Sequence, residues 1–216
     1  REFGDCERGA AHIKTALDLN NGDSDAWCNY SMMLLHEGRL AEAISVCDRL
    51  LAAKPGLDEA RLNRAHANLK LGRFAEAWPD YEARKLTRSN YIPRPYVFPE
   101  WRGEPLTGKT VLVYAEQGLG DEIMFASCLP DLIACAGRCV LECTPRLERL
   151  MRRSFPGATL HAAEQSDVDT GWLAQVGPVD YQVALGSLPG FFRRQQSDFP
   201  QHAGYLRADP ARVEHW

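Results

Sequence analysis

A repeat of 34 residues constrains the first half of this chain more than any other feature. The hexapeptide GRLAEA at 38–43 recurs 34 residues later as GRFAEA at 72–77. Chains with such a period fold as stacked copies of one supersecondary unit. The apolar pattern predicts two helices in the first complete unit, over about 25–37 and 41–53, and Lys54-Pro55-Gly56 then breaks the chain. The sequence therefore predicts a helical solenoid over residues 1–86, built from a partial unit and two full units.

The repeat resembles the tetratricopeptide repeat (TPR), a family of two-helix units. It matches that pattern at Trp27, Gly38, Glu42-Ala43 and Pro55 in one unit, and at Gly72, Glu76-Ala77 and Tyr81 in the next. It departs from the pattern at Arg61 and Arg84, where the family prefers Trp and Ala. The resemblance implies that the helices of each unit cross closely at the small residues Ala43 and Ala77. It also implies that the second unit caps the array with a polar outer edge.

The TPR resemblance implies a concave groove that binds a protein or peptide. Three residues from the first helix of each full unit are expected to line it, six in all: Asn29, Met32, His36, Asn63, His66 and Lys70. Asn29 and Asn63 occupy the same repeat position, and an Asn amide can both donate to and accept from a peptide backbone. The pair is similar to the asparagine ladder of some TPR-bearing transferases. The alternative is that both amides bond within the array, and the two histidines are expected on the groove surface without a metal.

Composition excludes several classes of function. The chain of 216 residues has a net charge of −4 and a pI of about 5.9. No broad basic footprint for nucleic acid exists, so no nucleic-acid partner is expected. No run of 18 apolar residues predicts a membrane-spanning helix.

Cysteine usage favours a reducing compartment. Seven cysteines, an odd number, argue against a disulfide framework, so we expect a cytoplasmic protein. Cys128, Cys135, Cys139 and Cys143 lack the Cys-x2-Cys spacing of structural zinc sites. We expect them to be small buried hydrophobic residues, with no metal bound.

Residues 87–107 interrupt the periodicity with prolines and aromatic residues. Prolines at 93, 95, 99 and 105 alternate with Tyr91, Tyr96, Phe98 and Trp101. A flexible linker would be rich in Gly and Ser, and aromatic side chains seek burial. We therefore expect an ordered strap between the domains.

The second half, 108–216, alternates strand and helix patterns. Strands are expected at 110–115, 139–143, 158–162 and 181–185, with helical patterns at 123–133 and 145–154. Such alternation predicts a Rossmann-like parallel sheet, so the fold class is α plus α/β.

The turn after the first strand is the candidate site of this half. The sequence EQGLGDE at 116–122 holds a Gly-x-Gly pair, but Ile123 takes the place of the third glycine of a dinucleotide fingerprint. Asp121 and Glu122 would also direct negative charge at a phosphate bound there, so NAD and FAD are disfavoured. A carboxylate at a helix start, at the carboxyl end of a central strand, instead suggests a different ligand.

A second resemblance covers about residues 99–216. The motifs Trp101-x-Gly103, Leu106-x-Gly108-Lys109-Thr110, EQGLGD at 116–121, Pro130, Ser187-Leu188-Pro189 and Tyr205-Leu206 follow in order. Together they resemble the acceptor-side domain of bacterial TPR-linked glycosyltransferases, which are similar to the heptosyltransferase family (glycosyltransferase family 9) of the two-domain GT-B fold. The resemblance implies that Asp121 is the general base and that Glu116, Gln117, Gly118 and Gly120 bind substrate. The alternative is that Asp121 only caps its helix.

The GT-B resemblance also implies what lies outside the chain. The chain ends at Trp216, before the donor half of that fold, so we expect a fragment that is inactive alone. No cofactor is expected in the fragment, a nucleotide-sugar donor is expected for the complete protein, and the acceptor is a glycan or a protein. The alternative function is a non-catalytic TPR interaction module with a degenerate transferase-like domain. Asp167-Val168-Asp169 matches a metal-binding pattern but is expected to be a solvated loop.

Overall fold

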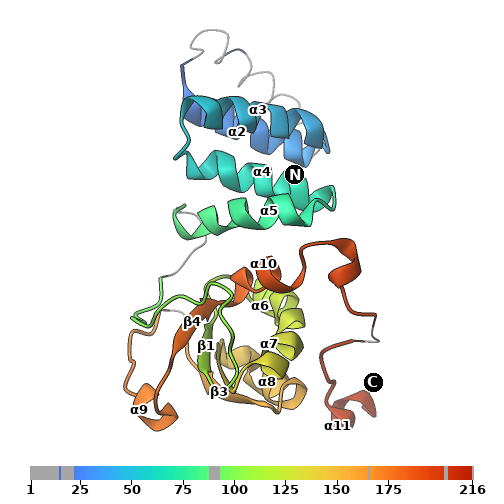
Figure 1. Ribbon diagram of the computed structural model, residues 1–216. Coiled ribbons are helices and arrows are strands. Elements are labelled where there is room, and N and C mark those ends of the chain that lie inside the picture. The colour runs from blue at the N-terminus through green and yellow to red at the C-terminus, as the bar shows by residue number, and fades with distance from the viewer. Residues whose placement is uncertain (1–14, 16–21, 88–92, 165, 202–203, 216) are drawn as a thin grey trace. The chain divides into compact units, whose positions relative to one another are not determined.

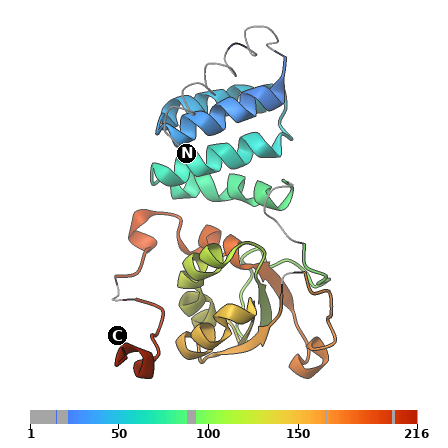
Figure 2. The same cartoon turned by 180° about the vertical axis from the view of Figure 1, so that it is seen from behind.

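The chain divides into two compact units, and each is described separately. The computed structural model describes residues 15, 22–87, 93–164, 166–201 and 204–215. One unit comprises Arg1–Arg88 with Arg194–Gln196, and the other comprises Ser89–Arg193 with Ser197–Trp216. Figures 1 and 2 show a helical first unit and an α/β second unit.

The first unit consists of paired helices joined by glycine turns. Its described helices are α2 (Ser24–His36), α3 (Leu40–Ala53), α4 (Asp58–Lys70), α5 (Phe74–Tyr81) and the 3-10 helix η1 (Glu82–Lys85). Gly38 (φ 76°) and Gly72 (φ 72°) end the first helix of each pair in left-handed backbone. The N–H of Arg39 then bonds to the carbonyl of Leu34 at 2.9 Å, and that of Arg73 to Asn68 at 2.9 Å. These are Schellman caps, which explain why glycine recurs at this repeat position.

The helices pack through small residues, as the repeat pattern predicts. Ala43 and Ala77 are fully buried, which confirms their expected place at the crossings. Leu34, Leu35 and Val46 form the core beside Ala43. The guanidinium of Arg64 bonds to Asp48 on α3 at 2.7 Å and to Asp80 on α5 at 2.6 Å. One side chain of α4 therefore ties together three successive helices.

The second unit contains a parallel sheet of four strands. The strands are β1 (Thr110–Tyr114), β2 (Arg138–Cys143), β3 (Ala158–Ala162) and β4 (Tyr181–Ala184), in the order β3-β2-β1-β4. Val111 aligns with Cys139 of β2 on one side and with Tyr181 of β4 on the other. All four predicted strands are confirmed, and so is the parallel α/β architecture.

Helices connect the strands and cover one face of the sheet. The connecting elements are α6 (Leu119–Phe125), η2 (Ala126–Cys128), α7 (Leu129–Cys135), η3 (Pro145–Leu147), α8 (Glu148–Ser154) and α9 (Leu173–Val176). After β4 come η4 (Leu185–Ser187), α10 (Pro189–Phe192), η5 (Gln196–Asp198) and α11 (Pro210–Val213). In Figures 1 and 2, α6, α7 and α8 lie on one side of the sheet and α9 on the other.

The opposite face is covered by the proline-rich strap, of which residues 93–107 are described. Tyr96 packs with Leu112, Tyr114, Val140 and Ala184 of the sheet, together with Val176 of α9. The N–H of Gln182 bonds to the carbonyl of Pro99 at 2.9 Å, and the N–H of Trp101 bonds back to Gln182 at 2.8 Å. The described part of the strap is therefore ordered and belongs to the α/β unit, where it extends the β4 edge. Residues 88–92 of the expected strap lie outside the described residues.

Candidate functional site

The candidate site lies beside β1, where the strand order of the sheet reverses. From β1 the chain proceeds to β2 and β3 on one side, and β4 occupies the other side of β1. The carboxyl ends of β1 and β4 therefore flank a topological switch point, where open α/β sheets bind their ligands. A crevice at these ends is lined by Glu116, Gln117, Asp121, Glu122, Phe125 and Leu185.

The turn after β1 is held by the Asp121 carboxylate. Gly118 precedes α6 in extended backbone, and its N–H donates to the Asp121 carboxylate at 3.2 Å. The Glu122 N–H donates to the carbonyl of Gly118 at 3.0 Å. Asp121 therefore performs the capping role that was its alternative interpretation, and it does so at the third helical position. Asp121 is half-buried.

Glu122 connects two strand ends. Its side chain is 2% exposed and accepts hydrogen bonds from both the N–H and the hydroxyl of Thr144, which follows β2. Buried carboxylates require such partners. Glu122 therefore fixes the turn after β1 relative to the turn after β2.

The chemistry of the crevice favours a ligand with hydroxyl groups over one with phosphates. Glu116 and Glu122 are buried and Asp121 is half-buried, all within seven residues of one helix start. Carboxylates accept hydrogen bonds from hydroxyls, whereas they repel a phosphate. A Cβ built on Gly120 would meet nothing within 4 Å, so the backbone there is open to approach. The space between the lining side chains themselves has no room for a water molecule.

The structure brings part of the predicted set of site residues together. Glu116, Gln117 and Asp121 line the crevice together, and Gly118 and Gly120 form the adjoining turn. Phe125 and Leu185 were missed as lining residues, and Glu122 was noted only for its charge. Thr144 directly follows a predicted strand, and Leu185 was predicted as the last residue of one, so both lie at strand ends that the sequence had located.

The expected asparagine ladder does not form as two exposed rungs. Asn63 is only 4% exposed, and its amide donates to the carbonyl of Cys28 at 3.1 Å and to the hydroxyl of Ser31 at 2.8 Å. Asn29, at the same repeat position, is exposed. The expectation that Asn63 reads a bound peptide is therefore wrong, because its amide links α4 to α2 within the array.

The other predicted groove residues differ in accessibility. Met32 and His36 on α2 are exposed, with Met32 at 38%. Lys70 is exposed, and its ammonium group donates to the carbonyl of Leu35 at 3.0 Å, at the end of α2. His66 is half-buried, with its ring 6.0 Å from that of Tyr81 in an edge arrangement. Asn29, Met32, His36 and Lys70 are thus left as the accessible members of the predicted groove.

Burial of His66 predicts an acid-sensitive step in stability. Burial, and then the nearby Lys70 ammonium, lower the pKa of His66 below its ordinary value of 6.5. Above that value both the folded and the unfolded chain carry a neutral imidazole. Below it the unfolded chain binds the proton more readily, so the free energy of unfolding falls as the pH falls.

We expect His66→Gln to flatten this part of the pH dependence. The urea midpoint, measured between about pH 7.5 and 5.5, should fall less in His66→Gln than in the unsubstituted protein. His36→Gln is the matched control, because His36 is exposed on the equivalent helix. Equal slopes for all three proteins would contradict the prediction.

The cysteines are mostly buried, as expected, with one correction. Cys128, Cys139 and Cys143 are buried, and burial raises the pKa of the Cys139 and Cys143 thiols to about 12. Cys135 is exposed, so its expected burial is wrong. It lies at the end of α7, where its thiol donates to the carbonyl of Leu132 at 3.3 Å. Among the described residues no group of three or more His, Cys, Asp or Glu side chains could hold a metal ion.

Part of the first unit matches a known protein family. Residues 1–58 match the family model of the tetratricopeptide repeat. The helical region is TPR-like. This agrees with the paired helices, the buried alanines and the glycine caps of the described residues.

Two individual proteins show similarity over longer stretches. Protein FlbA of Caulobacter vibrioides is 31% identical over 230 residues, which cover 99% of this chain and 38% of that protein. This chain therefore spans well under half the length of that relative. The solved structure of an O-GlcNAc transferase mutant from Thermobaculum terrenum aligns with a TM-score of 0.34 at 12% identity, covering 88% of this chain and 45% of that one.

None of the helices in the described part of the chain is both long enough and apolar enough to cross a bilayer.

Proposed function

We propose that this chain is part of a TPR-containing glycosyltransferase, in which the α/β unit holds the acceptor half of the sugar-transfer cleft. The observation that carries this proposal is the acidic helix start at the topological switch point, where Glu116, Asp121 and Glu122 gather beside the end of β4. The ordered motifs of residues 99–216, which resemble heptosyltransferase-like GT-B domains, support it. The chain spans 38% of its curated relative, so the donor-binding half would belong to the rest of a longer protein.

In the proposed reaction Asp121 acts as general base. Its carboxylate removes the proton of an acceptor hydroxyl while that oxygen attacks the anomeric carbon of a nucleotide-sugar. The bond from the anomeric carbon to the phosphate oxygen breaks, and the nucleoside diphosphate leaves. Glu116 and Gln117 orient the acceptor by hydrogen bonds to its other hydroxyls. Glu122 is a positioning residue, since its bonds to Thr144 hold the helix start in place.

The repeats would recruit the acceptor or a partner protein. TPR units commonly present a concave surface to peptides, and the accessible side chains of α2 and α4 offer one here. In this proposal residues 1–86 serve as the recruiting domain, 87–107 as the connection and 108–216 as the acceptor domain. The thiols and the acidic net charge fit a cytoplasmic setting.

A second candidate function is a non-catalytic TPR interaction module with a degenerate transferase-like domain. It is favoured by the state of Asp121, whose carboxylate is engaged by the Gly118 N–H, and by the absence of a water-sized space between the lining side chains of the crevice. In that case the α/β unit would be a scaffold, and only the repeats would bind a partner.

Asp121→Asn separates these candidates because the amide oxygen can still accept the Gly118 N–H. The substitution removes the base but keeps the cap. In the intact polypeptide made by its source cells, we expect turnover to fall about 100-fold, as for loss of a general base. The assay is nucleoside diphosphate release from a panel of nucleotide-sugars in the presence of a source-cell extract as acceptor. The melting temperature of Asp121→Asn should be unchanged.

A matched control makes the same substitution at a capping aspartate outside the α/β unit. Asp23 caps α2 by accepting from the N–H groups of Asp25 and Ala26, so Asp23→Asn makes the same chemical change far along the chain. It should leave turnover intact. Full turnover in Asp121→Asn would reject the base role, and no nucleotide-sugar turnover at all in the intact protein would favour the interaction module.

A further inference from the structure

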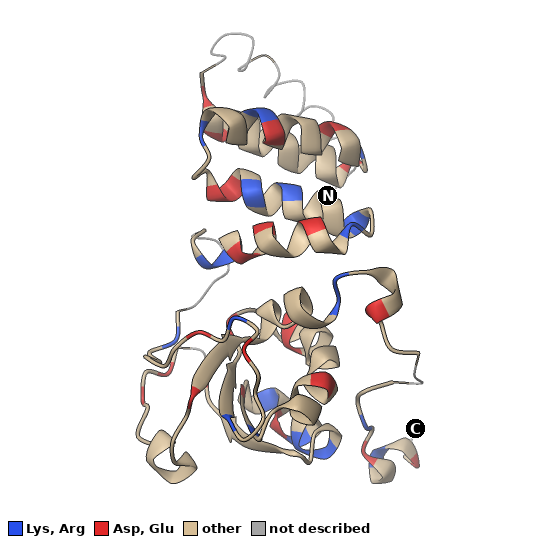
Figure 3. Ribbon diagram, in the orientation of Figure 1, with Lys and Arg blue, Asp and Glu red and all other residues tan. Residues whose placement is uncertain are grey.

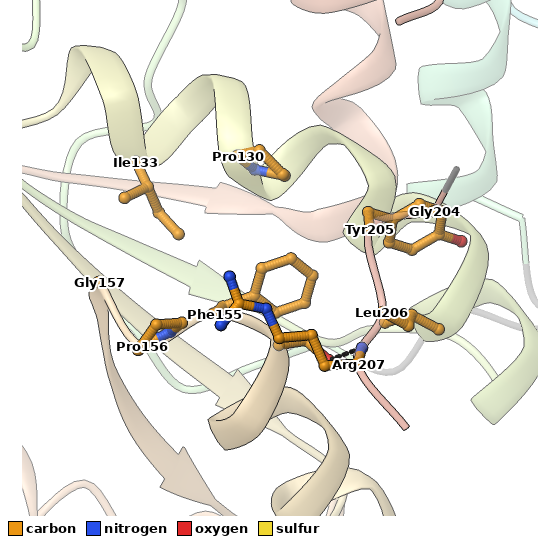
Figure 4. Close-up of a pocket in the computed structure, with 10 residues that line it drawn as sticks. Pro130, Ile133, Phe155, Pro156, Gly157, Gly204, Tyr205, Leu206 and Arg207 are labelled. Atoms are coloured by element: carbon orange, nitrogen blue, oxygen red, sulfur yellow. Dashed lines mark hydrogen bonds between the residues drawn. The ribbon is translucent and has the colours of Figure 1, made fainter. Parts of the chain in front are cut away.

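A second cavity in the α/β unit shares no residue with the switch-point crevice. It has a volume of about 390 Å³ and lies between α7, the loop that joins α8 to β3, and the segment 204–207 near the end of the chain (Figure 4). That loop enters β3 at its amino end, whereas the crevice adjoins the carboxyl ends of β1 and β4. The volume falls within the range of small-molecule sites.

Apolar side chains line part of the cavity. Its apolar lining residues are Pro130 and Ile133 of α7, Phe155 and Pro156 of the loop, and Leu206. Ile133 is fixed closely against the loop, because a Cβ on Gly157 would lie only 2.9 Å from its methyl group. These walls suit a ring or a short acyl chain.

One cation faces this apolar space. Figure 4 shows the Arg207 side chain extending from the segment 204–207 toward Pro156. Within the described residues, the Arg207 guanidinium makes no hydrogen bond or ion pair. Its five donors are therefore available to an anion that enters the cavity.

The backbone around Arg207 is held without help from its side chain. The Arg207 N–H donates to the Ser154 hydroxyl at 2.9 Å, and its carbonyl accepts from the Arg153 guanidinium at 3.1 Å. The Tyr205 hydroxyl donates to the carbonyl of Ile123 at 2.9 Å. The segment thus forms a fixed wall, and the guanidinium is a group presented on it.

The surroundings of the cavity are also basic, although the chain as a whole is acidic. Figure 3 shows arginines gathered on α8, which leads into the loop that lines the cavity. Arg153 bonds to the carbonyl of Arg149 at 3.1 Å and lies 3.8 Å from the Asp209 carboxylate. Two acids face this cluster: Asp209, whose oxygen also accepts the Ala211 N–H, and Glu148, which pairs with Arg152 at 2.6 Å.

From the apolar walls and the free guanidinium, we propose that this cavity binds a small amphipathic anion. The ligand has an apolar body that fills the space between α7 and Phe155, and one carboxylate or phosphate that pairs with Arg207. A guanidinium matches either head group by two parallel hydrogen bonds.

The test uses octanoate, octyl phosphate and octanol as probes of the 216-residue chain. Binding is followed by backbone amide shifts in two-dimensional NMR spectra at low ionic strength. We expect octanoate or octyl phosphate to move the amides of Ser154, Phe155, Gly157 and residues 204–207, and octanol to bind more weakly. The stronger of the two anions identifies the head group.

Arg207→Gln should raise the Kd for the preferred anion about tenfold and leave octanol binding unchanged. Arg212→Gln is the control, because Arg212 is exposed on α11 and does not line the cavity. Equal binding of octanol and the anions would overturn the proposal, as would shifts confined to other residues or no shifts at all. Retention of anion affinity in Arg207→Gln would also overturn it.

Discussion

Glu142→Ala should lower the free energy of unfolding by about 3–5 kcal/mol, the cost of leaving a buried charge without its partner. Glu142 lies on β2, and its side chain is 1% exposed. It accepts from the Arg94 guanidinium at 2.6 Å, and Arg94 itself is 2% exposed. The Tyr96 hydroxyl donates to the same carboxylate oxygen. Burial, and then this bond to Glu142, raise the pKa of Tyr96 above its ordinary value.

This cluster fastens the strap to the middle of the sheet. Arg94 also donates to the carbonyl of Asp167 at 2.8 Å, which joins the strap to the loop that precedes α9. Removal of the Glu142 carboxylate would leave a buried guanidinium and a buried hydroxyl without their main acceptor. The urea midpoint of the 216-residue chain measures the loss.

Replacement of the whole cluster should restore most of the stability. In the triple variant Arg94→Met, Tyr96→Phe, Glu142→Leu, no polar group of the cluster is left unpaired, and apolar residues of similar volume often match a buried ion pair. The exposed pair Arg152–Glu148 is the control, and Glu148→Ala should cost about 0.5 kcal/mol or less. A small loss in Glu142→Ala, or no recovery in the triple variant, would contradict this explanation of how the strap is held.

The sequence predicted the elements better than the contacts between them. The repeat gave the helix pairs of the first unit because the glycine caps and small crossing residues are local signals. The strands were found because runs such as Thr110–Tyr114 are apolar and rich in β-branched residues. The strap was expected to be ordered from its aromatic residues, but its pairing with β4 and its bond to Glu142 involve residues far apart in sequence.

For the candidate site, too, the local motif was predicted and the contacts between distant residues were not. The turn 116–122 was identified because a Gly-x-Gly pair after a strand is a local motif. Leu185 was missed because the end of β4 reaches the crevice only through the strand order. Asn29 and Asn63 occupy identical repeat positions but different environments, since Asn63 has α2 beside it to accept its hydrogen bonds. A repeat pattern predicts where a side chain lies on its helix, but not which residues pack against it.

Gly137→Ala should lower the free energy of unfolding by about 3 kcal/mol, near the upper end of the usual cost of overpacking. A Cβ at Gly137 would lie 2.6 Å from two backbone atoms of Gly108 and 2.7 Å from the nitrogen of Lys109. Backbone atoms cannot rotate aside as a side chain can. The two segments would have to separate.

Separation would disrupt the start of the central strand pair. The Gly137 N–H bonds to the carbonyl of Leu106 at 2.9 Å, and the Arg138 N–H bonds to the carbonyl of Lys109 at 2.9 Å. These bonds precede the register in which Thr110 of β1 aligns with Arg138 of β2. A shift here therefore reaches both strands, and through β1 the turn that holds the candidate site.

Gly108→Ala separates this steric effect from backbone strain. Gly108 adopts φ 71°, but a Cβ there would meet nothing within 4 Å. It should cost only about 1 kcal/mol, the penalty of left-handed backbone for alanine. In urea unfolding, the free energy of unfolding of Gly137→Ala should therefore be well below that of Gly108→Ala. Equal losses in the two variants would mean that the close approach of these two segments does not determine how β1 and β2 begin to pair.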